Sequence, residues 1–183
     1  MEWMIPGTVI KAQREDAAQI EQQFSAMFLA GGMVLSQVTG ITGLEPHAVQ
    51  NWVKRGFLTP PERKHYSLKQ LCRIININML KNVLPMERIV GLLSYINGNL
   101  DDDSDDIIDD SQLYFMFVRL AAQANRMNTP KGRDECIDRE LASYREPVPG
   151  ARARVEKVLS VMLTAWASAQ LRQAAEAMLQ EMT

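Results

Sequence analysis

The sequence predicts an all-α protein, on three observations. Apolar residues recur at helical spacing along most of the chain. Residues that begin or end helices separate these stretches at short intervals. The alternation typical of strands is missing, except around Pro60 to Tyr66. The expected helices span about residues 13–29, 36–42, 46–56, 67–82, 85–97, 111–127, 134–144 and 151–182.

Helix boundaries are clearest between residues 43 and 70. Gly43 interrupts the apolar spacing, and Pro46 follows as a favoured first helical residue, because its missing N–H is not needed there. Gly56 can adopt the left-handed conformation that ends a helix. Ser67 and Gln70 have the spacing of a capping box, in which each side chain binds the other residue's backbone N–H. These signals predict two short helices followed by a longer one.

An acidic run divides the chain. Residues 101–110 hold seven aspartates in ten positions, and so many carboxylates favour a solvated, self-repelling linker. Thr129 to Gly132, with Pro130, predicts a further break between helices, and Ser111 is the expected cap of the helix after the run. We therefore expect an N-terminal helix in residues 1–32, a module in 33–98, an acidic linker in 99–110, and a helical region for dimerisation or effector binding in 111–183.

Composition excludes several classes of protein. No apolar stretch reaches the roughly 18 residues of a membrane span, and the first residues lack the pattern of a signal peptide. Cys72 and Cys136 lie far apart, which favours two reduced thiols and a cytoplasmic protein. A glycine-rich phosphate loop, a cluster of metal ligands and a nucleophile beside a base are all missing. We expect no enzyme activity, no catalytic or metal site and no cofactor.

The net charge of −2 conceals a basic middle segment. Residues 33–97 carry eight basic and three acidic side chains, a balance of +5, whereas residues 1–32 and 98–183 have balances of −2 and −5. A basic segment between acidic ones is compatible with a surface that binds a polyanion. Such a charge balance also occurs by chance on protein surfaces. By itself it therefore does not predict polyanion binding, and a sequence motif is needed as well.

The middle segment resembles the helix-turn-helix module of MerR-type regulators, which includes a wing. The resemblance covers about residues 35–96 and depends on ordered spacing across four helices rather than on one short motif. In and after the second helix, the matching residues are Pro46, Val49, Trp52, Lys54, Gly56, Phe57 and Leu58. Further along, they are Pro60 or Pro61, Arg63, Tyr66, Ser67, Leu71, Ile74 and the stretch from Leu84 to Ile89.

This resemblance implies a sequence-specific DNA-binding transcription regulator that acts as a homodimer on double-stranded DNA. Gln50 and Asn51 can each present a donor and an acceptor to adenine. The other residues expected to contact DNA are His47 beside the base edges and Lys54, Arg55, Arg63 and Lys64 on phosphates. A small-molecule or protein effector is expected at the C-terminal helices.

The chain departs from the MerR pattern in ways that keep a second interpretation open. Gln50 and Asn51 replace a basic and an aromatic residue, and the stretch from Pro60 to Tyr66 is short for a two-stranded wing. A protein-interaction module that keeps the fold without binding DNA is the alternative. The whole chain also resembles an uncharacterised group of proteins from Gram-positive bacteria, classed as a domain of unknown function and described as candidate regulators.

Overall fold

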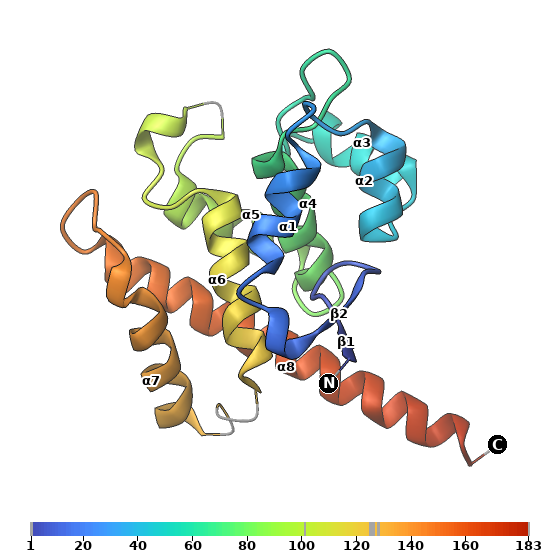
Figure 1. The fold of residues 1–183 in the computed structure, drawn as a ribbon, viewed down its shortest axis with the longest axis vertical. Coiled ribbons are helices and arrows are strands. Elements are labelled where there is room, and N and C mark those ends of the chain that lie inside the picture. Colours follow the sequence, from blue (N-terminus) through green and yellow to red (C-terminus); the bar gives the residue numbers. More distant parts are fainter. Residues whose placement is uncertain (1, 101, 125–126, 128, 183) are drawn as a thin grey trace.

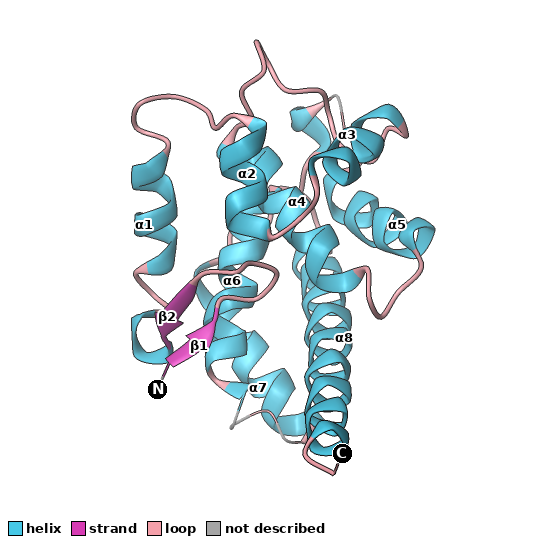
Figure 2. Ribbon diagram, turned by 90° about the vertical axis from the view of Figure 1, so that its right-hand side faces the viewer, coloured by secondary structure: helices cyan, strands magenta, loops and turns pink. Residues whose placement is uncertain are grey.

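The structure, a computed structural model, describes residues 2–100, 102–124, 127 and 129–182. It is mostly helical, as the sequence predicts, with one small sheet (Figures 1 and 2). The helices are α1 (Ile20–Met27), α2 (Leu35–Thr42), α3 (Pro46–Lys54), α4 (Leu68–Leu80), α5 (Met86–Asn97), α6 (Asp110–Ala122), α7 (Pro130–Glu140) and α8 (Ala151–Gln180). Short 3₁₀ turns occupy Arg14–Asp16, Asp103–Asp105 and Leu141–Ser143.

The sheet was not expected from the sequence. Strands β1 (Glu2–Met4) and β2 (Lys11–Gln13) pair antiparallel, with Trp3 opposite Ala12, and lie below α1 and α2 in Figure 2. Each strand has three residues, too few to show an alternation in sequence. The chain between them turns through Gly7, whose φ of +75° suits glycine. The first helix consequently begins at Ile20 and not near residue 13.

Helix α4 passes through the centre of the molecule and packs against α2, α5, α6 and α8. Most of its side chains are buried, because it has neighbours on several sides. The expected capping box is confirmed: Ser67 Oγ accepts from the Gln70 backbone N–H (3.2 Å), and the Ser67 N–H donates to Gln70 Oε1 (2.8 Å). Asn78 Nδ2 donates to the carbonyls of Gly7 and Thr42, both at 2.9 Å, and so links α4 to the N-terminal turn and the end of α2.

Three aromatic rings join the N-terminal helix to α6. Phe24 of α1 lies 6.2 Å from the Tyr114 ring and 5.8 Å from the Phe115 ring, between centroids, and all three side chains are almost completely buried. The Tyr114 hydroxyl donates to the carbonyl of Pro6 at 3.0 Å. Residues about a hundred positions apart therefore form one part of the core.

The acidic run is only partly solvated, which corrects the expectation for it. Ile107 and Ile108 are buried, and Asp110 is 1% exposed. Asp109, not Ser111, caps α6: its Oδ1 accepts from the backbone N–H groups of Ser111 (2.7 Å) and Gln112 (3.0 Å). The first aspartate of the run, residue 101, lies outside the described residues.

The helix expected from about residue 134 begins earlier, at Pro130, so residues 130–132 belong to it and not to a break. Thr129 caps α7, its hydroxyl accepting from the Gly132 N–H at 3.1 Å, and Pro130 is the first helical residue. Proline at this position begins a helix rather than ending one. The helix before it, expected to reach about residue 127, ends at Ala122; residues 125, 126 and 128 lie outside the description.

Helix α8 is buried along its first two thirds and exposed afterwards. Its buried residues extend from Ala151 to Ala169, whereas every described position from Gln170 to Met182 is exposed. Figure 1 shows this last part projecting beyond the other helices at the lower right. Within the described part of the chain, no helix combines the length and apolar character needed to cross a bilayer.

Candidate nucleic-acid interface

Helices α2 and α3 form a compact pair. Helix α2 ends at Thr42 and is followed by Gly43, which has a φ of +68°, and α3 begins three residues after Gly43 with Pro46, as expected. Val49 and Trp52 of α3 are buried, and so are Val38 of α2 and Leu58 after α3. One side of α3 is thereby fixed against the core, and its other side faces outwards.

The outward side of α3 carries four of the residues selected from the sequence. His47, Gln50, Asn51 and Lys54 are all exposed, and their spacing places them on neighbouring turns of one face. Helix α3 lies at the edge of the molecule, at the upper right of Figure 1, far from α7 and from the projecting end of α8. None of the described helices covers this face of α3.

A tight turn at residues 62–65 occupies the position of the shortened wing that the sequence suggested. Glu62 and His65 form an isolated antiparallel bridge, and the His65 N–H donates to the Glu62 carbonyl at 2.8 Å. The two residues between them, Arg63 and Lys64, have φ values of 47° and 68°. Positive φ at both central residues matches the two-residue turn of β-hairpins, where glycine or asparagine is usual. The turn places two exposed cations at its tip.

A shallow groove of about 670 Å³ lies between α3, the start of α2 and this turn. Gln50, Lys54 and Lys64 line it, together with the apolar residues Leu35, Val53, Pro61 and others. The fold therefore brings two α3 side chains and the turn cation Lys64, ten positions after Lys54, onto one surface.

Two other expected cations lie apart from this groove. Arg55 Nη2 is 3.6 Å from Glu87 Oε1 of α5, and its guanidinium lies 4.6 Å from the centre of the Phe57 ring. Arg63 lines a different cavity, together with His65, whose ring Nδ1 is 2.9 Å from the Arg63 carbonyl oxygen. Both arginines were expected to contact phosphates with Lys54 and Lys64, and neither lines the groove that these lysines share.

The sequence did not predict a buried ion pair between α4 and α6. Arg73 of α4 and Asp110 of α6 are 2% and 1% exposed, and Arg73 Nη1 lies 3.1 Å from Asp110 Oδ2. Arg73 Nε also donates to the Phe57 carbonyl at 2.9 Å, so it holds the segment that follows α3. Burial raises the pKa of Asp110, and the nearby guanidinium partly opposes this shift. The available signal was an arginine inside an apolar helical run.

The segment between α3 and the Arg63–Lys64 turn has a second anchor on α4. Gln70 Nε2 donates to the Thr59 hydroxyl at 2.9 Å and to the carbonyls of Thr59 and Pro60, both at 3.1 Å. The capping box that begins α4 therefore also fixes the chain between α3 and the Arg63–Lys64 turn.

The described residues contain no group of three or more His, Cys, Asp or Glu side chains arranged to hold a metal ion.

Comparison with known proteins identifies a family but no activity. A stretch of 104 residues, 55% of the chain, is 27% identical to Uncharacterized protein YkrK of Bacillus subtilis (strain 168). The match covers 45% of that relative, so the chain spans less than half of its length. No solved structure matches the chain. Residues 20–117, more than half of the chain, match the family described as Domain of unknown function (DUF1836). The chain therefore belongs to the DUF1836 family, which confirms the expected membership of an uncharacterised bacterial family.

Proposed function

We propose that this protein is a sequence-specific DNA-binding transcription regulator, with α2 and α3 as a MerR-like helix-turn-helix unit. The observation that carries the proposal is the outward face of α3, which is exposed and polar and carries Lys54, while its inner face is packed. The Arg63–Lys64 turn would serve as a minimal wing. Lys64 lines the same groove as Gln50 and Lys54, as a wing beside a recognition helix requires.

The dimensions of α3 suit the major groove of DNA. An α-helix with its side chains is about 10–12 Å across, and the major groove of B-DNA is about 12 Å wide. Gln50 and Asn51 would read adenine through paired donor and acceptor groups. Lys54 and Lys64 would contact phosphates and fix the register, while Arg55 would reach DNA only by leaving Glu87.

The exposed end of α8 supports a homodimer. Leu171, Ala175, Met178 and Met182 are separated by four, three and four residues, the spacing of a coiled-coil seam. Leu171 and Met178 are 73% and 65% exposed, so this seam has no apolar cover within the described chain. Two copies related by a twofold axis would each supply the same face, and dimers of helix-turn-helix units read two half-sites.

DNA binding is tested by selection from random duplexes, followed by affinity measurement over a range of salt concentrations. The selected duplex should bind with an affinity that falls as salt rises. Lys54→Glu with Lys64→Glu should weaken binding on the order of 100-fold, because two phosphate contacts become repulsive, and should reduce the salt slope by about two.

The matched control is Lys131→Glu with Lys157→Glu. It changes the net charge equally, but at exposed positions on α7 and α8. Its affinity for the selected duplex should stay near that of the unmodified protein. Failure to enrich any sequence, or equal losses for the two double variants, would remove the proposal.

The dimer is tested by sedimentation equilibrium. Met178→Asp places a charge in the seam and should convert a dimer into a monomer, because the paired carboxylates would lose their water. Gln173→Asp, exposed on another side of the same helix, should remain a dimer. A monomeric parent protein, or a dimer unaffected by Met178→Asp, would contradict this part of the proposal.

The groove beside α3 favours one other function, a protein-interaction module. Its lining includes Val34, Leu35, Val53, Pro61 and Tyr66, an apolar surface suited to a hydrophobic side chain of a partner. Purification from cells of the source organism distinguishes the two. One stoichiometric protein partner and no bound DNA would replace the DNA-binding proposal.

A further inference from the structure

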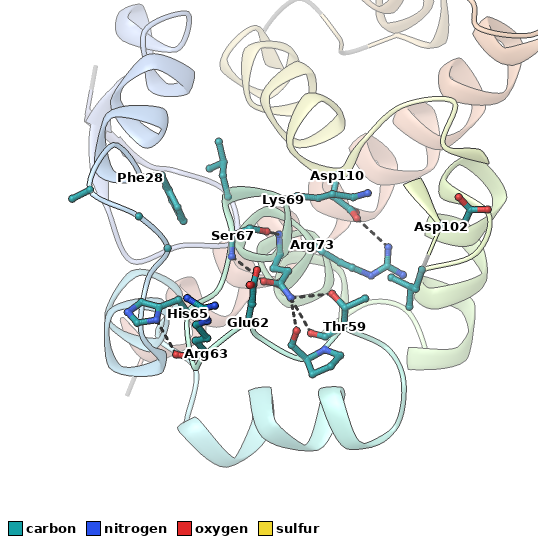
Figure 3. A pocket seen from close by; sticks show the side chains of 17 residues that line it. Phe28, Thr59, Glu62, Arg63, His65, Ser67, Lys69, Arg73, Asp102 and Asp110 are labelled. Atoms are coloured by element: carbon teal, nitrogen blue, oxygen red, sulfur yellow. Dashed lines mark hydrogen bonds and ion pairs between the residues drawn. The ribbon is translucent and has the colours of Figure 1, made fainter. Parts of the chain in front are cut away.

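The cavity at the start of α4 is chemically distinct from the surface of α3. It measures about 1150 Å³ and lies between the loop after α1, the segment from Thr59 to Gln70, and the chain after α5 (Figure 3). This volume is slightly above the usual range for small-molecule sites, roughly 300–1,000 Å³, so a small molecule would fill only part of it. Cationic, anionic and apolar side chains all contribute to its lining.

The buried ion pair Arg73–Asp110 lies on one side of this cavity, across from Arg63 and His65 (Figure 3). Each member still has one unused polar atom. Arg73 uses Nε for the Phe57 carbonyl and Nη1 for Asp110 Oδ2, whereas Arg73 Nη2 and Asp110 Oδ1 have no hydrogen-bond partner among the described residues. A buried polar atom without a partner costs about 1–3 kcal/mol, so both atoms favour a molecule that satisfies them.

The unused atoms specify what such a molecule carries. Nη2 is a donor and requires an acceptor, such as a carbonyl oxygen; Oδ1 is an acceptor and requires a donor, such as an N–H group. The charges of Arg73 and Asp110 compensate each other, so a further ion would leave a buried charge unbalanced. We propose that this cavity binds a small neutral molecule whose edge presents a carbonyl oxygen beside an N–H, as in a carboxamide or a lactam nucleobase.

The remaining lining suits the body of such a molecule. Phe28, Pro60, Leu68 and Leu100 supply apolar surface, against which a flat ring loses water favourably. The Arg73–Asp110 pair would supply the specificity for an amide. A site built to hydrogen-bond an amide rejects an analogue that leaves the site's buried polar groups unpaired.

A ligand in this cavity would affect the proposed DNA-reading unit, α2 and α3. Arg73 fixes the Phe57 carbonyl directly after α3, and Gln70, which also lines the cavity, fixes Thr59 and Pro60. A ligand on Arg73 Nη2 therefore contacts the side chain that positions the end of α3. This consequence depends on the proposed function, whereas binding of the ligand does not.

Binding is tested on the full chain without DNA, by titration with benzamide and with uracil. The readout is the Nε–H resonance of Arg73 in two-dimensional NMR spectra, because Arg73 lines the cavity and its Nε–H is in the same guanidinium as Nη2. Both probes should shift the resonance saturably, with dissociation constants of about millimolar as expected for molecules of this size. N,N-Dimethylbenzamide, which has no N–H, and benzoate, which is an anion, should bind at least about ten times more weakly.

Asp110→Asn keeps the side-chain shape but replaces a carboxylate acceptor and its charge, so binding of benzamide should fall at least about tenfold. If this variant does not fold, the relative binding of the four probes to the unmodified protein tests the proposal without it. No shift with benzamide and uracil, or equal shifts with N,N-dimethylbenzamide, would overturn the proposal and leave a buried water as the partner of these atoms. Because no DNA is present, neither outcome depends on whether the protein binds DNA.

Discussion

Replacement of Arg73 by methionine is expected to lower the free energy of unfolding by about 3–5 kcal/mol. The substitution removes the guanidinium that lies 3.1 Å from Asp110 Oδ2 and leaves the carboxylate, 1% exposed, without its main counter-charge. It also removes the donor to the Phe57 carbonyl. Urea denaturation followed by circular dichroism measures the loss.

Two controls separate the ion pair from general effects of losing an arginine. Arg172→Met removes an exposed i,i+4 pair with Glu176 and should cost less than about 1 kcal/mol. Arg73→Met with Asp110→Leu removes both charges and should recover most of the stability, because apolar side chains can replace a buried pair. A loss for Arg73→Met no larger than that for Arg172→Met would contradict the expectation.

The loss caused by Arg73→Met should also depend on pH. Because burial raises the pKa of Asp110, the folded protein holds this proton at a higher pH than the unfolded chain does. Ionisation of Asp110 therefore lowers stability as pH rises through that interval. Without Arg73 the pKa of Asp110 rises further, with Lys69 as the remaining nearby cation and Asp106 opposing it. The deficit relative to the unmodified protein should shrink as pH falls towards the ordinary aspartate value of 3.8.

Replacement of Phe24 by alanine is expected to lower the free energy of unfolding by about 3–5 kcal/mol. The ring is 1% exposed and packs on Tyr114 and Phe115, so its removal leaves a cavity between α1 and α6. These rings connect segments on both sides of the acidic run. We therefore expect the variant to unfold in one transition, coincident by circular dichroism and by tryptophan fluorescence.

The control for Phe24→Ala is Leu29→Ala. Leu29 follows α1 and is 88% exposed, so its truncation should change stability by no more than about 0.5 kcal/mol. A comparable loss in both variants, or a separate early transition for Phe24→Ala, would show that α1 does not share the core with α6.

The helices near residues 35–80 could be predicted because their boundary signals are local. Pro46 begins α3, Gly43 follows α2, and Ser67 with Gln70 begins α4, as expected. Each signal acts within about four residues, so no distant contact is needed to interpret it. The exposure of His47, Gln50, Asn51 and Lys54 also agrees with the sequence, because Val49 and Trp52 mark the buried face.

Other features could not be predicted because they depend on distant partners. Strands β1 and β2 are too short to show a pattern and form by pairing with each other. By composition Asp110 belongs to an acidic run that is expected to be solvated. It is buried because Arg73, 37 positions earlier, forms an ion pair with it in the core. Arg55 differs from Lys54 in its surroundings partly because α5 places Glu87 beside it.

The sequence by itself determined where α2, α3 and α4 begin and which side of α3 is apolar, since hydrogen bonds at helix ends and helical periodicity are set by neighbouring residues. The tertiary structure alone decided which charged side chains meet. It placed Lys64 beside the α3 residues Gln50 and Lys54, and it buried Arg73 with Asp110. The physical reason is that the energy of a charge depends on the solvent and the opposite charges around it, and folding brings both from distant parts of the chain.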